Sequence, residues 1–296
     1  MILMFHNIVP DNISKTLEIP SHNLRTSEFL KIIRILKRFF KIISLKDYID
    51  NYINKNKYPY FKCAITFDDG TASSFEHGIK FLNIKNIPVT IFISTCQIYD
   101  KKILDAYYLA ALCLESQYKS IKIKNYNFSL QTFSQKVSAY KKLLKLVNFK
   151  IKDKLIEELK DSYPLSEKEI KYYRGLNEYE IKTYLEKYSS LSISSHSNNH
   201  YSLKEMDYDN QFKEIKNSLD VISSINGTNK AFLSYPYGEY NYDTLKVIES
   251  LSLSTCFAVK AKNISSNKSF EIERIGLYKS NFIYLLAKIL KYKLRI

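Results

Sequence analysis

Short apolar runs rich in β-branched residues alternate with helical stretches along most of the chain, and this alternation constrains the fold more than any other feature. The strand-like runs are 2–5, 63–67, 87–93, 191–194, 231–234 and 254–259. The helical stretches include 26–40, 177–187, 209–224 and 241–250. Strands that alternate with helices predict parallel strands joined by right-handed crossovers, and therefore an α/β fold.

Two segments depart from the alternation. Residues 101–173 carry Tyr- and Lys-rich helical sequence, which predicts a helical lobe inserted into a single domain that spans 1–296. Residues 280–295 have the spacing of an amphipathic helix, and 277–296 contain five basic side chains and no acidic one. Such a helix either packs on its own domain or makes peripheral contact with an anionic membrane surface.

The net charge of +15 comes from 45 Lys and Arg against 30 Asp and Glu. Only six of the basic residues are Arg, and the lysines are spread along the whole chain. Surfaces that bind nucleic acid more often cluster their charge and use Arg for phosphate and base contacts. We therefore expect no nucleic-acid partner.

The cysteines and the apolar runs bear on location. Four scattered cysteines, without metal-finger spacing, indicate reduced thiols in a core. No apolar run reaches the roughly 18 to 20 residues of a membrane span. The opening residues MILMFHNIVPDN lack a basic lead, so we expect no secretory signal. The expected location is cytoplasmic, with attachment to the inner face of the membrane as an option.

Polar or turn residues follow four of the predicted strands. They are His6, the Asp68–Asp69 pair, His196 with His200, and Pro236-Tyr237-Gly238. The carboxyl ends of parallel strands lie on one face of a sheet or barrel, where the chemistry of such folds takes place. The four strand ends are therefore expected to build one site.

Each motif has a chemical and a structural interpretation. Gly70 lets the chain turn after Asp68–Asp69, so that one carboxylate can bind a cation while the other moves protons; a solvated Asp-Gly turn is the alternative. His196 and His200 have the spacing of ligands to Zn²⁺ or a similar ion, or are unrelated surface histidines. The Tyr235–Gly238 turn can aim a main-chain N–H at a developing oxyanion, or is a rigid loop.

Taken in order, Thr66-Phe-Asp-Asp-Gly70, His196-Ser-Asn-Asn-His200 and Tyr235-Pro-Tyr-Gly238 resemble the polysaccharide deacetylases of carbohydrate esterase family 4. The resemblance covers about residues 2–100 and 174–277. It implies a distorted (β/α) barrel of about seven parallel strands that removes N- or O-acetyl groups from sugars with a divalent metal. Zinc is the expected ion, with cobalt, nickel or manganese as alternatives.

The same resemblance implies the roles of individual residues. Asp68 would be the general base, and Asp69, His196 and His200 would be the metal ligands. The main-chain N–H of Tyr237 would line the oxyanion hole.

The sequence departs from the family pattern at two positions. Many members have an Arg where this chain has Ser234, and Arg274, expected on the last strand, is the candidate replacement. The late Leu-x-x-His that supplies the acid is absent, since no His follows His200. His6 is the substitute candidate for the acid, with a histidine of the core as the alternative. We expect His22 and His77 on the surface.

The sequence therefore predicts a metal-dependent hydrolase that removes acetyl groups from an N-acetylated sugar or glycan intermediate made in the cytoplasm. One alternative is a catalytically silent carbohydrate-binding relative, which the missing late His and motif Arg favour. Another is a related barrel hydrolase that acts on a non-sugar amide, because it would share the metal site and differ only in its pocket.

Overall fold

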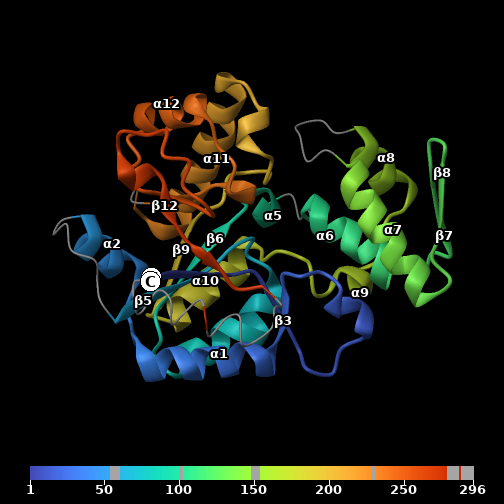
Figure 1. Ribbon diagram of the computed structural model, residues 1–296, viewed down its shortest axis with the longest axis horizontal. Helices are drawn as coiled ribbons and strands as arrows, with labels where there is room; N and C mark the ends of the chain where they lie inside the picture. The colour runs from blue at the N-terminus through green and yellow to red at the C-terminus, as the bar shows by residue number, and fades with distance from the viewer. Residues whose placement is uncertain (54–60, 100–102, 148–153, 229–230, 279–286, 288–296) are drawn as a thin grey trace.

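Parallel strands form a nearly closed barrel in the computed structural model, which describes residues 1–53, 61–99, 103–147, 154–228, 231–278 and 287 (Figure 1). Around the barrel the strand order is β12-β11-β10-β9-β6-β5-β1-β13. The bounds are β1 Ile2–Phe5, β5 Lys62–Phe67, β6 Val89–Ile93, β9 Leu191–Ser195, β10 Leu233–Ser234, β11 Cys256–Ala258, β12 Ile272–Glu273 and β13 Ile275–Gly276. A short strand, β4 (Lys41–Ile42), pairs with the start of β5.

The barrel closes at a strand that is interrupted by one residue. β12 pairs with β11, and β13 pairs with β1, while Arg274 lies between β12 and β13. The Arg274 N–H donates to the carbonyl of Ala258, so the seam is still hydrogen-bonded at the break. With β12 and β13 counted as one strand the ring has seven members. The predicted distorted (β/α) barrel of about seven parallel strands is confirmed.

Alternation along β5 carries Asp68 to the inside of the barrel. Ile65 and Phe67 join the large apolar cluster beneath the surrounding helices, whereas Ala64 joins a separate cluster with Phe92 and Phe257. Since successive side chains of a strand face opposite sides, Thr66 and Asp68 continue the inward row of Ala64. The strand period of two therefore delivers a carboxylate to the inner end of β5.

Helices surround the barrel and bury their apolar faces against it. They are α1 Thr26–Phe39, α2 Leu45–Ile53, α3 Ala72–Ser74, α4 Lys80–Ile84, α5 Cys96–Tyr99, α10 Glu178–Lys187, α11 Tyr208–Asn226 and α12 Tyr242–Ser250. A π-helical turn, η2 (Phe75–Ile79), joins α3 to α4, and 3₁₀ turns lie at Lys15–Glu18, Leu203–Glu205, Pro236–Gly238 and Lys268–Phe270. In α1 the predicted apolar face is buried, and the Phe29 ring meets Phe5 at 5.1 Å and Phe67 at 5.7 Å. Each such buried ring contributes about 1.5–3 kcal/mol.

A second small sheet lies just beyond β1 and was not predicted. β2 (Asn7–Val9) pairs in parallel with β3 (Asn23–Arg25), in a register that places Asn7 opposite Asn23. The residues before these partners, His6 and His22, are therefore neighbours.

The inserted segment builds a lobe beside the barrel, shown in green in Figure 1. It contains α6 (Asp105–Ala110), a π turn η3 (Ala111–Glu115), α7 (Phe133–Leu146), α8 (Lys154–Ser162) and α9 (Glu167–Ile170). It also contains an antiparallel hairpin, β7 (Ser120–Ile123) with β8 (Tyr126–Ser129), which the helical prediction for 101–173 missed. The side chains of these elements, with Leu17 and Cys96 from outside the lobe, pack into an apolar cluster that is separate from the barrel clusters.

The predicted amphipathic helix at 280–295 lies outside the described residues apart from Ala287, so it stays a prediction. Among the described helices, none combines the length and the apolar character needed to cross a bilayer.

Candidate active site

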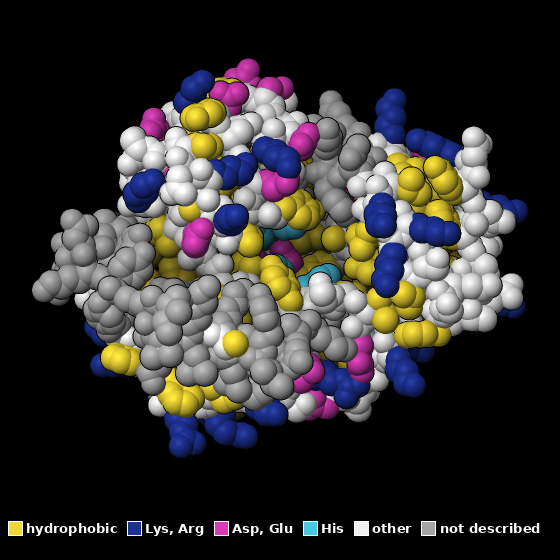
Figure 2. Space-filling view, in the orientation of Figure 1, with side chains coloured by type: hydrophobic (Ala, Val, Ile, Leu, Met, Phe, Trp, Pro, Cys, Tyr) yellow, Lys and Arg dark blue, Asp and Glu magenta, His cyan; other side chains and the backbone are white. Residues whose placement is uncertain are grey.

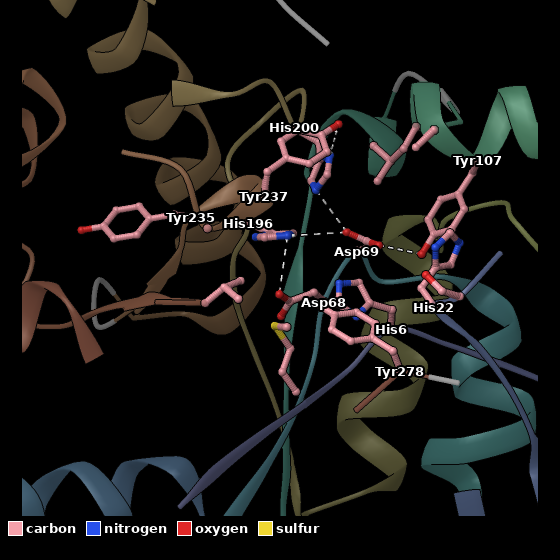
Figure 3. A pocket seen from close by; sticks show the side chains of 16 residues that line it. His6, His22, Asp68, Asp69, Tyr107, His196, His200, Tyr235, Tyr237 and Tyr278 are labelled. Atoms are coloured by element: carbon pink, nitrogen blue, oxygen red, sulfur yellow. Dashed lines mark hydrogen bonds and ion pairs between the residues drawn. The ribbon is translucent and has the colours of Figure 1, made fainter. Parts of the chain in front are cut away.

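The carboxyl ends of the barrel strands open into a cavity of about 320 Å³. Figure 2 shows histidine and acidic side chains at the bottom of this hollow, with hydrophobic side chains around it. Six of the predicted site residues line the cavity: His6, Asp68, Asp69, His196, His200 and Tyr237 (Figure 3). The seventh, Arg274, lies behind Asp68. The structure therefore brings together side chains from strands that are far apart in the sequence, as the strand-end argument predicted.

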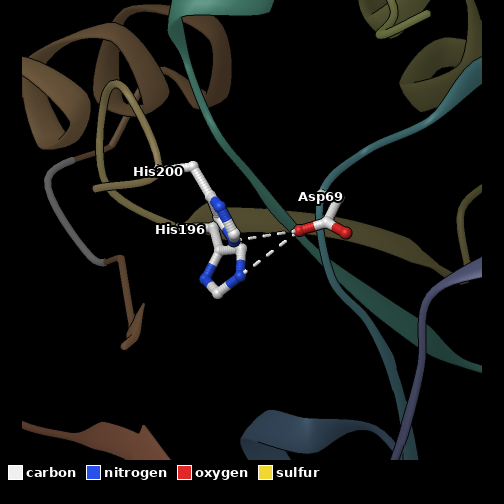
Figure 4. A group of neighbouring side chains, drawn as sticks. All are labelled: Asp69, His196 and His200. Carbon is white, nitrogen blue, oxygen red and sulfur yellow. Dashed lines mark ion pairs between the residues drawn. The ribbon is translucent and has the colours of Figure 1, made fainter. Parts of the chain in front are cut away.

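Asp69, His196 and His200 form a compact set of metal-type donors (Figure 4). Asp69 Oδ1 lies 3.5 Å from His196 Nε2 and 3.3 Å from His200 Nε2, and the potential ligand atoms all lie within 4.8 Å of one another. Asp69 and His200 both adopt left-handed backbone, with φ of 73° and 60°. Residues other than glycine adopt this conformation at a cost, and such strain is concentrated at functional sites.

The hydrogen bonds of this set leave the inward-facing atoms available. His196 Nδ1 lies 2.9 Å from the carbonyl of Ser234 and must donate to it, which directs the lone pair of Nε2 towards Asp69. His200 Nδ1 lies 3.2 Å from the Tyr237 hydroxyl. Asp69 Oδ1 is buried and makes no hydrogen bond among the described residues. A buried carboxylate oxygen without a donor, facing two imidazole nitrogens, fits a divalent cation.

The protonation states suit the same interpretation. Burial lowers the pKa of His200 to about 4 against the opposing charge of Asp69, so the ring is neutral at pH 7. Burial alone would raise the pKa of Asp69, but its neighbours His200, His6 and His196 and the hydrogen bond from Tyr107 hold it below its ordinary value. Metal ligation requires neutral imidazole and ionised carboxylate, which are the forms that these pKa shifts give to His200 and Asp69.

Asp68 is bound at both oxygens by Arg274. The two N–H···O distances are 2.7 Å to Oδ1 and 2.6 Å to Oδ2, and both side chains are almost fully buried. Arg274 also donates to Ser234 Oγ at 2.5 Å and to Thr66 Oγ1 at 3.2 Å. Burial raises the pKa of Asp68, but the charge and hydrogen bonds of Arg274, together with the nearby His196 and His6, outweigh it and hold the pKa well below the ordinary range. Ser234, where many family members carry Arg, thus contacts the arginine that reaches in from the last strand.

Two histidines share one wall of the cavity. The His6 ring centroid lies 5.5 Å from that of Tyr278 and 6.3 Å from that of His22. The prediction that His22 lies on the surface was wrong, because the β2–β3 pairing brings it beside His6. Burial and the charge of His6 lower the pKa of His22 to about 4. His77 does not line the cavity, and its side chain is 27% exposed.

The turn at Tyr235–Gly238 contributes Tyr237. This residue has φ of 58°, lines the cavity, and packs its ring 4.6 Å from the His200 ring. The turn thus holds the Tyr237 side chain at the cavity, against His200.

Three supporting residues escaped the sequence argument. Tyr107 of α6 donates its hydroxyl to Asp69 Oδ2 at 2.6 Å, and His22 packs against the Tyr107 ring. Glu214 of α11 is buried and accepts hydrogen bonds from Ser197 Oγ at 3.1 Å and Asn199 Nδ2 at 2.9 Å. Glu214 thereby holds the loop between the two metal-type histidines. The sequence alone could not single out Glu214, because its burial becomes apparent only when α11 is packed against the barrel.

The polysaccharide deacetylase family model matches residues 165–256, which include both histidines of the His196–His200 motif and the Tyr235–Gly238 turn. Asp68 and Asp69 lie outside the matched stretch. This family match confirms the resemblance to polysaccharide deacetylases that the sequence motifs indicated.

Solved structures share the fold over nearly the whole chain. The Streptococcus pyogenes deacetylase PplD, in complex with acetate, has 16% identity and a TM-score of 0.61, with 97% of this chain and 96% of that chain covered. IcaB from Ammonifex degensii has 12% identity and a TM-score of 0.60, covering 97% and 95%. A de-N-acetylase from Aggregatibacter actinomycetemcomitans has 13% identity and a TM-score of 0.58, covering 97% and 98%. At these identities the likeness shows the fold alone. No curated protein matches the sequence.

Proposed function

We propose that this protein is a metal-dependent hydrolase that removes acetyl groups from an N-acetylated sugar or glycan. The observation that carries the proposal is Asp69 Oδ1, which is buried, accepts no hydrogen bond from the described part of the chain, and faces two Nε2 atoms beside an ionised Asp68 in a cavity. One carboxylate is thus available to a cation while the other is available to a proton. The family match and the fold support the choice of acetylated carbohydrate as substrate.

Asp69, His196 and His200 would hold the ion, and a set of two His and one carboxylate suits zinc. When bound there, the ion would supply Lewis-acid polarisation of the acetyl carbonyl and would lower the pKa of a water molecule. Asp68 would accept the proton of the attacking water. Arg274 keeps Asp68 ionised and fixes its orientation, so the carboxylate is ready before substrate binds.

The reaction also needs a hydrogen-bond donor for the oxyanion and a proton donor for the leaving group. The main-chain N–H of Tyr237 is the proposed donor to the negative oxygen that develops on the acetyl carbon. His6 is the proposed acid for the leaving amine, because it lines the cavity and is close enough to Asp68 and Asp69 to stabilise both charges. His22 suits this role less well, since with a pKa of about 4 its ring is not in the acidic imidazolium form at pH 7.

The test is acetate release from a panel of N-acetylated sugars, oligosaccharides and lipid-linked glycans, with zinc added. We expect release by the wild-type chain and about one bound ion per chain. His196→Ala should abolish both, whereas His77→Ala, outside the cavity lining, should retain both. Full metal content in His196→Ala would refute the assigned site.

The same assay tests the role of His6 and distinguishes the two alternative functions. His6→Ala should remove the alkaline limb of the pH–rate profile, and an unchanged limb would exclude His6 as the acid. Metal binding without acetate release from any substrate would favour the carbohydrate-binding relative. Release from a non-sugar acetamide alone would favour the amide hydrolase.

A further inference from the structure

One side chain of the inserted lobe contacts Asp69, the carboxylate among the three candidate metal ligands. Tyr107, on α6, is 2% exposed, and its hydroxyl donates to Asp69 Oδ2 at 2.6 Å. Figure 3 shows this contact at the edge of the cavity, opposite the two histidines.

This hydrogen bond makes the two oxygens of Asp69 unequal. Oδ2 accepts from Tyr107, while Oδ1 faces His196 and His200 and makes no hydrogen bond among the described residues. The main chain of Asp69 is also held, because Gln97 Nε2 donates to its carbonyl at 2.6 Å. A carboxylate fixed in this way presents a single oxygen to a cation.

Tyr107 is itself held in place by the lobe and the barrel together. Its ring stacks on Tyr173 at 5.5 Å with an interplanar angle of 26°, and both rings belong to the lobe cluster. The His22 ring packs edge-on at 5.0 Å on another side. Since these contacts fix the ring, the hydroxyl is positioned before any ion arrives.

We propose that Tyr107 is a positioning residue that restricts Asp69 to one-oxygen ligation, so that the inserted lobe is a working part of the metal centre. The inference rests on the proposed function, because it assigns a task to a neighbour of the proposed metal ligand. Outer hydrogen-bond partners of this kind typically change metal affinity about 10- to 100-fold.

The experiment is a zinc titration of the full-length, metal-stripped chain in competition with a chromogenic chelator. Tyr107→Phe removes only the hydroxyl, and we expect its affinity for zinc to fall about 10- to 100-fold. The matched control is Tyr108→Phe on the same helix, since the buried Tyr108 hydroxyl donates to the Leu159 carbonyl at 2.6 Å within the lobe. Tyr108→Phe should bind zinc as the wild type does.

A second measurement separates positioning from a general loss of structure. Cobalt(II) substituted into the site should absorb less strongly in Tyr107→Phe, because the freed Oδ2 raises the coordination number, whereas Tyr108→Phe should keep the wild-type spectrum. Wild-type affinity and spectrum in Tyr107→Phe, or equal losses in both variants, would overturn this inference while leaving the metal centre in place. Undiminished zinc binding by Asp69→Asn, or none by the wild type, would overturn the proposed function and the inference with it.

Discussion

The barrel rim and the inserted lobe both contribute to the surroundings of Asp69, but they do so with different kinds of residue. The rim supplies Asp68, Asp69 and His196 directly after strands, and His200 from the loop that follows β9. The lobe supplies Tyr107 from within a cluster of aromatic and aliphatic side chains. The difference shows that a site can depend on a region whose sequence carries no chemical motif. The predictions that follow test how far the two regions are separate.

Removing Arg274 should have the largest effect, because it leaves Asp68 buried and unpaired. We expect Arg274→Leu to lose about 3–5 kcal/mol of unfolding free energy, measured by urea denaturation. Arg174→Leu is the matched control, since Arg174 also makes a two-point contact, with Glu180, but its side chain is 40% exposed. A loss of about 0–1 kcal/mol is expected there.

Lowering the pH should reduce the difference in unfolding free energy between the wild type and Arg274→Leu. The pKa of Asp68 is depressed in the folded wild type, so its contribution is present above the unfolded pKa of about 3.9 and is lost as the pH falls below it. In Arg274→Leu the unpaired Asp68 instead protonates readily and the penalty is relieved. The gap between the two proteins should shrink by up to about 1.4 kcal/mol per pH unit; a constant gap from pH 7 to pH 3 would contradict the assignment of the pair.

Creating a cavity in the lobe core and another in the barrel core tests whether the two regions unfold together. Leu143→Ala in the lobe and Leu36→Ala beneath the barrel both remove a fully buried side chain, and each should cost about 2–5 kcal/mol. Because the lobe has a separate core, Leu143→Ala should accelerate amide hydrogen exchange in α7 and α8 and leave β5 and β6 protected. Uniform acceleration would show instead that lobe and barrel open as one unit.

Glu214→Gln should reduce the unfolding free energy less than Arg274→Leu or the two Leu→Ala substitutions do. The change replaces a carboxylate that accepts from Ser197 and Asn199 with an amide that presents an additional donor, and we expect a loss of about 1–3 kcal/mol. Zinc affinity should fall as well, since the loop carries His200. Asp220→Asn, at an exposed position on the same helix, should change neither the unfolding free energy nor the zinc affinity. Equal effects of the two substitutions would contradict the role assigned to Glu214.

The sequence was informative where chemistry and strand periodicity coincide. The row Ala64, Thr66, Asp68 is a strand pattern, and the chain must turn after it at Gly70, so the location of the Asp pair follows from local rules. Tyr107 could not be found in this way. It is one of 25 tyrosines, next to Tyr108 in the same helix, and only the packed lobe decides which hydroxyl reaches Asp69.

His22 and the hairpin of the lobe were missed for a related reason. The two strands β2 and β3 have three residues each, too few for a periodic pattern, yet their pairing brings His22 to the cavity. The β7–β8 hairpin consists of two four-residue strands within Lys- and Tyr-rich sequence, and its short alternation was outweighed by the flanking helical pattern.

The interrupted strand at Arg274 has a consequence for the order of folding. Asp68 and Arg274 are 206 positions apart, so the counter-charge arrives only when the seam between β11 and β1 is filled. Contacts of such separation carry a large loop-closure entropy and form late. Until then a carboxylate inside the barrel would be unpaired, and it would be driven to take up a proton. We therefore expect the ionisation of Asp68 inside the barrel to be coupled to the event that completes the barrel.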